Sequence, residues 1–438
     1  MRRSLPTLAV PLATFAVALA LFGVLSRGGG DAGAARAQAV ADRVELSAGA
    51  TPAERIDALE KLVRADRGGA PLANQLGEAY LQKGRETGDP SYYGRAEALF
   101  LRARRIAPRD ADAVIGLGTL ALARHDFREA LGLARQARRL APDVIRSYAV
   151  LVDAEVELGR HEAAARSLQR MVDAKPNLAA YARVSYFREL RGDLPGAVEA
   201  MELAVSAGGG SAESAAYVQT LLGTLEFTRG RLAAARRAYG AALERLPGYV
   251  PAQAGLARVD AARGRPGRAL ERYAKVTERL PLPEYVVAQG ETQLAAGDRR
   301  GARESFDLVD AQRRLLDAAG VNTDVEFALF EADHGNRGRG VELGRRAWRA
   351  APGVRSADAL GWALTRAGKP EAGLRMARRA LALGSRDPLF LVHAGLSARA
   401  AGRSDLARRW LRRSLADNPR FSPLWAPRAR RALRSLEA

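Results

Sequence analysis

The sequence predicts an all-α protein, a solenoid of about ten stacked helical hairpins that takes up most of the 438 residues. Three recurrences predict this fold. A mostly small residue inside each expected first helix returns every 33 to 41 residues. A glycine follows it seven positions later in nine of the ten units, and an alanine or glycine stands five positions beyond that, except in the first unit, where Ala96 comes after an insertion. Because no single hairpin can bury its own apolar face, the units are expected to stack.

The recurrent positions explain how each hairpin closes. The first-helix positions are Gly77, Gly118, Val152, Ser185, Gly223, Ala257, Gly290, Ala328, Gly361 and Gly395. The turn glycines are Gly84, Gly159, Gly192, Gly230, Gly264, Gly297, Gly335, Gly368 and Gly402, with His125 in their place in the second unit. Glycine reaches the left-handed backbone that ends a first helix. The small residue that follows lets the two helices approach closely.

The first residues predict a membrane segment. Residues 5–25 carry no charge, and about 20 apolar residues are enough to cross a bilayer. Arg2 and Arg3 precede the segment, so the N-terminus is expected in the cytosol and the rest of the chain outside it. Residues 1–25 then act as a signal-anchor. The alternative is a signal peptide that is removed near Ala37 or Ala39, with the mature protein secreted.

The remaining elements follow in chain order. Residues 26–50 are rich in glycine and alanine and are expected to form a flexible linker. The capping signature Thr-Pro-Ala-Glu then begins an N-terminal capping helix over 51–69. The repeat array is expected over 70–421. Apolar residues spaced among arginines predict a C-terminal capping helix over 422–438.

The array resembles the tetratricopeptide repeat, a helix–turn–helix unit of about 34 residues. Besides the glycine and alanine positions, the prolines that close its units are found at Pro108, Pro142, Pro176, Pro247, Pro281, Pro352 and Pro419. With the N-terminal apolar segment, the chain looks like a bacterial member of the exported or membrane-anchored type. The resemblance implies a right-handed superhelix with first helices on its concave face and second helices on its convex face. It also implies a non-catalytic scaffold for protein partners.

The resemblance places a partner-binding groove on the first helices. The expected contact residues on this concave face are Asn74, Glu78, Asp153, Glu157, Arg183, Tyr186, Glu189, Tyr217, Phe227, Arg258, Glu291, Asp333, Trp362 and Arg366. Their mixed chemistry suits an extended or helical peptide segment of an unknown protein. Trp362 and Tyr217 are the expected aromatic anchors. The alternative is that each of these two only packs between repeats.

The charge balance adds a second candidate function. The chain has 69 basic and 49 acidic residues, a net charge of +20, and nearly all the basic residues are arginine. This bias is typical of GC-rich coding and also of a protein that binds an anionic partner. The arginine clusters fall mainly in the second helices, so the convex face could contact anionic lipid or cell-wall polymer. RNA binding is disfavoured because the first helices carry many acidic residues.

Catalytic and cofactor functions are not expected. The chain has no cysteine, which excludes disulfides, thiolate metal sites and cysteine nucleophiles. Its four histidines do not have the spacing of a metal site. The glycine-rich stretch 335–340 has the composition of a phosphate-binding loop, but no strand precedes it. We therefore expect no catalytic residue, no bound metal and no cofactor.

Overall fold

The computed structural model describes residues 52–65, 69–208 and 211–438, and these residues form helices and no strands. The chain is therefore all-α over the described residues, as predicted. The expected membrane segment at 5–25 and the linker at 26–50 lie outside them. None of the helices that the structure describes is long and apolar enough to span a bilayer.

An N-terminal helix, α3 (Pro52–Arg64), packs on α4, and ten hairpins follow. Their first helices are α4 (Gly69–Thr87), α6 (Ala111–Ala123), α8 (Arg146–Glu157), α10 (Leu178–Leu190), α12 (Ala212–Thr228), α14 (Val250–Ala262), α16 (Pro283–Ala296), α18 (Asp324–His334), α20 (Val354–Arg366) and α22 (Pro388–Ala400). Their second helices are α5 (Ser91–Ile106), α7 (Phe127–Leu140), α9 (His161–Ala174), α11 (Leu194–Ser206), α13 (Leu232–Arg245), α15 (Pro266–Arg279), α17 (Arg299–Ala318), α19 (Arg337–Ala350), α21 (Pro370–Ala380) and α23 (Ser404–Ala416). The last helix is α24 (Trp425–Glu437).

Aromatic side chains of second helices fill the space between neighbouring hairpins. Phe100 of α5 is fully buried, and its ring lies against Gly77 of the same hairpin and Gly116 of the next one. A Cβ at Gly77 would lie 2.7 Å from the ring. Tyr239 takes the equivalent place in the fifth hairpin. The small first-helix residues therefore leave room for a wedge that sets the spacing of the repeats.

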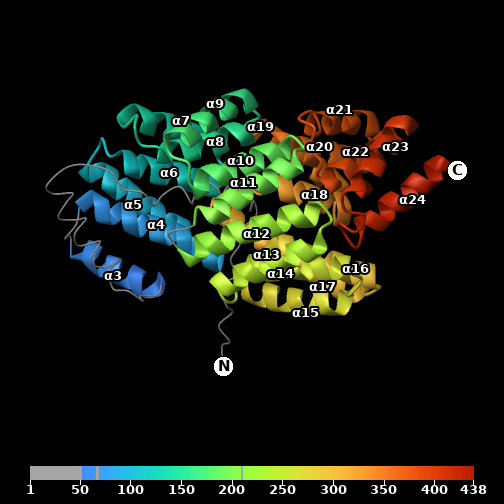
Figure 1. Ribbon diagram of the computed structural model, residues 1–438, viewed down its shortest axis with the longest axis horizontal. Coiled ribbons are helices and arrows are strands. Elements are labelled where there is room, and N and C mark those ends of the chain that lie inside the picture. The colour runs from blue at the N-terminus through green and yellow to red at the C-terminus, as the bar shows by residue number, and fades with distance from the viewer. Residues whose placement is uncertain (1–51, 66–68, 209–210) are drawn as a thin grey trace.

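The first helices form the inner layer of the superhelix. Several of them contact the first helix of the next hairpin, such as α18 with α20 and α20 with α22. Successive second helices make no comparable contacts within the described residues. Figure 1 shows the hairpins winding so that α18 to α20 come to lie beside α8 to α10.

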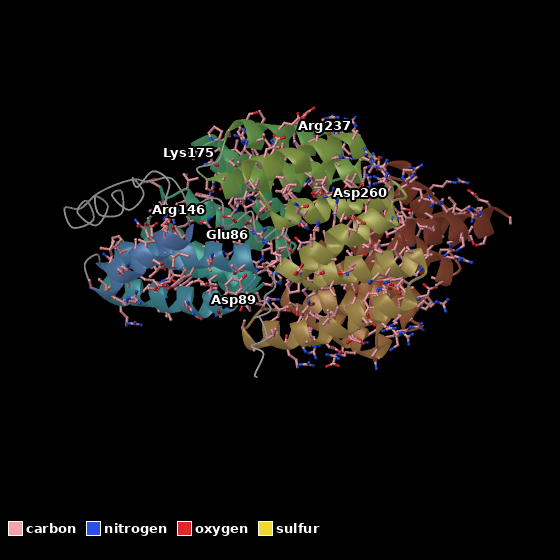
Figure 2. The ribbon with its side chains drawn as sticks, turned by 90° about the horizontal axis from the view of Figure 1, so that it is seen from below. Glu86, Asp89, Arg146, Lys175, Arg237 and Asp260 are labelled. Atoms are coloured by element: carbon pink, nitrogen blue, oxygen red, sulfur yellow. The ribbon has the colours of Figure 1, made fainter. Side chains whose placement is uncertain are left out.

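The second helices carry the outer charge. Figure 2 shows Lys175 and Arg237 at the edge of the molecule, while Asp260 lies further in. Exposed arginines of the second helices include Arg105, Arg135, Arg139, Arg236, Arg237, Arg345, Arg346, Arg375, Arg378, Arg379, Arg409, Arg412 and Arg413. The outer side of these helices is therefore basic.

Two turns of the superhelix touch through their backbones, at contacts that we call the inter-turn ladder. Its first rung joins the turn of the second hairpin to the junction before α18. There the amide N of Asn322 donates to the carbonyl O of Arg124 at 2.9 Å. The Asn322 carbonyl O lies 2.6 Å from Nδ1 of His125. His125 is the only described non-glycine residue with a positive φ, 59°.

The other rungs repeat this arrangement one hairpin further along. The turn at Gly159 lies against Pro352, the turn at Gly192 against Gly384, and the turn at Gly230 against Asp417. At the last rung, Nδ2 of Asn418 donates to the carbonyl O of Phe227 at 2.7 Å. In an ordinary solenoid each repeat contacts only its neighbours. Here residues almost 200 positions apart hold successive turns together, which closes the inner face.

Candidate functional site

The inner face contains a half-open cavity of about 400 Å³. It is lined mainly by first helices, α12, α14, α16, α18 and α22, together with residues 421–425 before and at the start of α24. Because α12 and α22 belong to different turns of the superhelix, the ladder at Gly230 and Asp417 fixes one side of this cavity. Its volume is within the range of pockets that hold small ligands or a short peptide stretch.

Aromatic rings form a large part of the cavity wall. The lining rings are those of Phe227, Phe327, Phe330, Phe421 and Trp425. Trp425 meets Trp362 edge to face, with ring centroids 5.6 Å apart. Trp362 in turn stacks on His393 at 4.5 Å with nearly parallel rings. This packing makes the wall rigid and apolar.

The polar part of the wall is acidic. Five carboxylate residues line the cavity among the described residues, Glu284, Glu291, Glu326, Asp333 and Asp387, against the single arginine Arg258. Two histidines, His334 and His393, also line the cavity, so its carboxylates outnumber its basic side chains in a chain whose net charge is +20.

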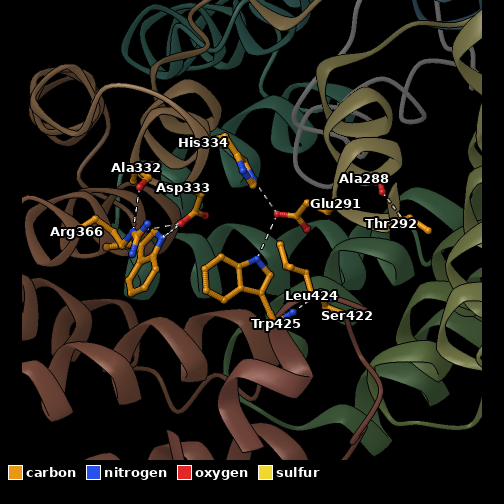
Figure 3. Close-up of polar contacts among 11 residues, drawn as sticks. Ala288, Glu291, Thr292, Ala332, Asp333, His334, Arg366, Ser422, Leu424 and Trp425 are labelled. Carbon is orange, nitrogen blue, oxygen red and sulfur yellow. Dashed lines mark hydrogen bonds and ion pairs between the residues drawn. The ribbon is translucent and has the colours of Figure 1, made fainter. Parts of the chain in front are cut away.

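Indole and imidazole nitrogens contact two of these carboxylates (Figure 3). Trp425 Nε1 donates to Oε1 of Glu291 at 3.3 Å, and His334 Nε2 lies 3.2 Å from the same oxygen. Trp362 Nε1 donates to Oδ1 of Asp333 at 2.8 Å. Arg366 stands 3.7 Å from that oxygen, but its Nε donates to the carbonyl O of Ala332 at 3.0 Å.

Burial makes these charges costly. It raises the pKa of Asp333 above its ordinary value, although His393 and the hydrogen bond from Trp362 act against the rise. Burial likewise raises the pKa of Asp387, whose side chain caps α22 by accepting from the amides of Leu389 and Phe390. A cation entering the cavity would stabilise the charged form of each group.

His393 adds an unused polar atom. It is 2% exposed, and its Nδ1 lies 2.9 Å from Oδ2 of Asp358. Burial acts to lower the pKa of His393, but the Asp358 carboxylate outweighs it, with Asp333 and Asp387 acting in the same direction, and the pKa is raised. Its Nε2 has no hydrogen-bond partner among the described residues. A protonated His393 therefore keeps an unpaired N–H donor, buried from solvent, in a residue that lines the cavity.

Some of the residues expected in the groove from sequence meet at this cavity. Phe227, Arg258 and Glu291 line it, as does Asp333. Trp362 and Arg366 lie directly behind Asp333.

The other expected residues lie elsewhere and form contacts within the chain. Asn74 donates to Asp110 at 2.7 Å, Glu78 accepts from Arg146 at 2.5 Å, and Tyr186 donates to Glu157 at 3.2 Å. The remaining members of this set are Asp153, Arg183, Glu189 and Tyr217. Arg183 binds both carboxylate oxygens of Asp153, at 3.0 and 2.9 Å, and this pair is almost fully buried. Burial, with the nearby Asp387 carboxylate, raises the pKa of Glu189 to about 8.

The two expected aromatic anchors are buried. Tyr217 is 6% exposed and Trp362 is 3% exposed, and both belong to packed clusters between repeats. Sequence reasoning missed Phe330, Phe421 and Asp387 as cavity residues. They come together only because the superhelix closes, and no local pattern in the sequence signals that closure.

Comparisons with known proteins agree with the repeat pattern. Tetratricopeptide repeat family models match residues 149–212 and 359–423, and another matches residues 226–290. No curated protein matches the chain.

Solved structures show distant likenesses. The chain is similar to the human IFIT1 dimer with m7Gppp-AAAA, at 13% identity over 93% of this chain and 96% of that one, with a TM-score of 0.49. It is also similar to the yeast Tom70, at 12% identity over 84% and 95% of the two chains, with a TM-score of 0.35. At such identities and TM-scores, the similarity to these two structures does not indicate what this chain binds. The family-model matches and the ten hairpins together identify the chain as a tetratricopeptide repeat protein.

Proposed function

We propose that the protein is a non-catalytic scaffold at the cell envelope that holds a segment of a partner protein in the cavity. Tetratricopeptide repeats support a role in protein interactions in general. The observation that carries the finer proposal is the cavity of about 400 Å³ on the inner face, walled by aromatic rings with a few oriented polar groups. Concave, largely apolar sites with few polar groups are typical of binding pockets.

The envelope location rests on the sequence. Residues 5–25 are uncharged and follow Arg2 and Arg3, which supports a retained anchor with the array outside the cytosol. Cleavage near Ala37 or Ala39 is the alternative outcome. Protease treatment of intact and of lysed spheroplasts, followed by mass spectrometry of the N-terminus, distinguishes the two. Protection of the array in intact spheroplasts would contradict the proposal.

Cross-linking in intact cells tests the cavity. Phe330 lines the cavity and is half-buried, so Phe330→Ala removes part of the wall with little loss of the core. Phe187 of α10 is similarly half-buried but does not line the cavity, which makes Phe187→Ala a matched control. We expect Phe330→Ala to lose a cross-linked partner that Phe187→Ala retains. Retention of every partner by both variants, at unchanged helicity, would refute the cavity as the binding site.

The basic outer face supports a second candidate function, binding of an anionic lipid or cell-wall polymer. Arg268, Arg272, Lys275 and Arg279 line a second cavity of about 490 Å³ between α14 and α15. Arg272 is already paired with Asp260 at 2.8 Å. A protein lacking residues 1–50 should bind anionic vesicles at low salt if this function is real. Failure to bind would exclude it.

A further inference from the structure

We propose that the segment held in the cavity is cationic, with a lysine or arginine side chain flanked by apolar residues. This inference rests on the proposed function, because it assigns the chemistry of the segment to the same cavity. The partner is therefore a basic peptide segment, and an acidic or neutral segment should be rejected.

The first argument is charge complementarity. Asp333, Glu291 and Asp387 line the cavity, and most of their hydrogen bonds come from neutral donors, namely indole and backbone N–H groups. Nearby cations compensate them only in part: Arg366 Nε stands 3.7 Å from Oδ1 of Asp333, and His393 acts to lower the pKa of both Asp333 and Asp387. Arg366 donates to a backbone carbonyl, and the guanidinium of Arg258 lies over the ring of Phe227 at 4.5 Å. Glu326 differs, since Arg355 binds it at 3.2 Å.

Burial strengthens this argument. The raised pKa values of Asp333 and Asp387 arise mainly from desolvation, so the folded protein bears the cost of holding these charges in a poorly hydrated space. An ammonium or guanidinium group placed among them would offset that cost.

The aromatic wall fits the same ligand. Phe227 and Trp425 each already have a guanidinium over their rings, Arg258 at 4.5 Å and Arg428 at 4.6 Å. Phe330 adds a further ring to the wall. Aromatic faces attract cations, and they also accept the apolar stem of a lysine or arginine. The rings of this wall therefore do accept guanidinium groups, and although the chain's own arginines already cover one face of Phe227 and of Trp425, the other rings can accept apolar neighbours.

His393 supplies an independent polar contact. Its Nε2 has no partner among the described residues, although the side chain is 2% exposed and lines the cavity. With Nδ1 held by Asp358, a protonated ring presents Nε2–H as a donor. A backbone carbonyl oxygen of an extended segment is a matching acceptor. A peptide is thus favoured over a small inorganic cation, which offers no acceptor.

Three short fluorescent peptides of the same length test the inference on the full-length protein in a mild detergent. The first alternates arginine and leucine, the second has the neutral isostere citrulline for each arginine, and the third has glutamate. Asp333→Asn with Glu291→Gln removes two negative charges and keeps acceptor oxygens for Trp362 and Trp425, and each substitution is also made alone. Glu371→Gln, at an exposed carboxylate at the start of α21, is the control.

We expect the arginine peptide to bind wild type at least about tenfold more tightly than the citrulline peptide. The double variant should lose this preference, and Glu371→Gln should keep it. Equal binding of the arginine and citrulline peptides, or a preference that survives in the double variant, would overturn the inference. So would no binding of any peptide. If Phe330→Ala still loses its cross-linked partner in those cases, the proposed function stands and only the cationic chemistry is wrong.

Discussion

Alanine at the turn glycines of the inter-turn ladder should loosen the superhelix, whereas alanine at equivalent glycines outside the ladder should not. Gly159 and Gly230 are ladder positions, with φ of 70° and 71°. Gly264 and Gly402 occupy the same place in their hairpins, with φ of 72° and 70°, but nothing lies within 4 Å of the position of a Cβ there. The four substitutions therefore share the backbone strain and differ in the contact with the other turn.

The structure allows both costs to be estimated. An alanine in the left-handed region costs about 1–2 kcal/mol at any of these positions. At Gly159 the added Cβ would lie 2.5 Å from the carbonyl O of Pro352, closer than real Cβ contacts allow. At Gly230 it would meet the carbonyl O of Asp417. Since backbone must move in both cases, overpacking adds about 1–3 kcal/mol. We expect a total loss of about 2–5 kcal/mol at ladder positions.

Urea unfolding followed by circular dichroism measures the loss, and small-angle X-ray scattering of the folded variants measures the radius of gyration. Gly159→Ala and Gly230→Ala should lower the unfolding midpoint more than Gly264→Ala and Gly402→Ala. They should also increase the radius of gyration at unchanged helix content. Equal midpoints in the two pairs, with unchanged dimensions, would show that the ladder does not hold the turns together.

Three further predictions concern buried ionisable groups. Arg183→Met leaves the buried Asp153 carboxylate without its partner and should cost about 3–5 kcal/mol of unfolding free energy. Adding Asp153→Leu should restore most of this loss. Equal losses in the single and the double variant, measured by urea unfolding, would contradict this prediction. Burial raises the pKa of Glu189 from 4.5 to about 8, so the folded chain binds a proton that the unfolded chain loses, and stability should fall as pH rises through this window. Glu189→Gln should flatten that dependence, and a parallel curve would refute the assignment. Burial lowers the pKa of His125 from 6.5 to about 4, so stability should fall as pH drops from 6.5 to 4. His125→Asn, which tolerates a positive φ, should remove this acid-side loss in thermal unfolding if the histidine causes it.

The local architecture could be predicted from the sequence because its causes are local and periodic. Most of the turn glycines mark the ends of first helices, and Gly159, Gly192 and Gly230 do have positive φ. The expectation was wrong at two positions, because Gly84 lies inside α4, which continues to Thr87, and Gly335 has a φ of −129°. Gly77 leaves room for a ring of the second helix, as the small-residue pattern predicts. The sequence also shows that His125 stands in the place of a turn glycine in the second unit. It does not show that His125 contacts the carbonyl O of Asn322.

The site was only partly predictable. Phe227, Arg258 and Glu291 were expected on the inner face because first helices line it, and they do line the cavity. Trp362 and Tyr217 were expected as anchors, and the structure buries both between repeats. An aromatic residue on an inner helix reads the same in sequence whether it faces a ligand or the next repeat, because both positions lie on the same helical stripe.

The sequence by itself determined an all-helical chain of hairpins, the place of most turns and the close approach of paired helices. Only the tertiary structure decided that Gly230 meets Asp417, that Asn418 binds the carbonyl of Phe227, and that an acidic, aromatic cavity lies between the turns. The physical reason is that curvature accumulates from small rotations between successive hairpins. Each rotation is too small to leave a mark in the local sequence, yet their sum determines which distant residues meet.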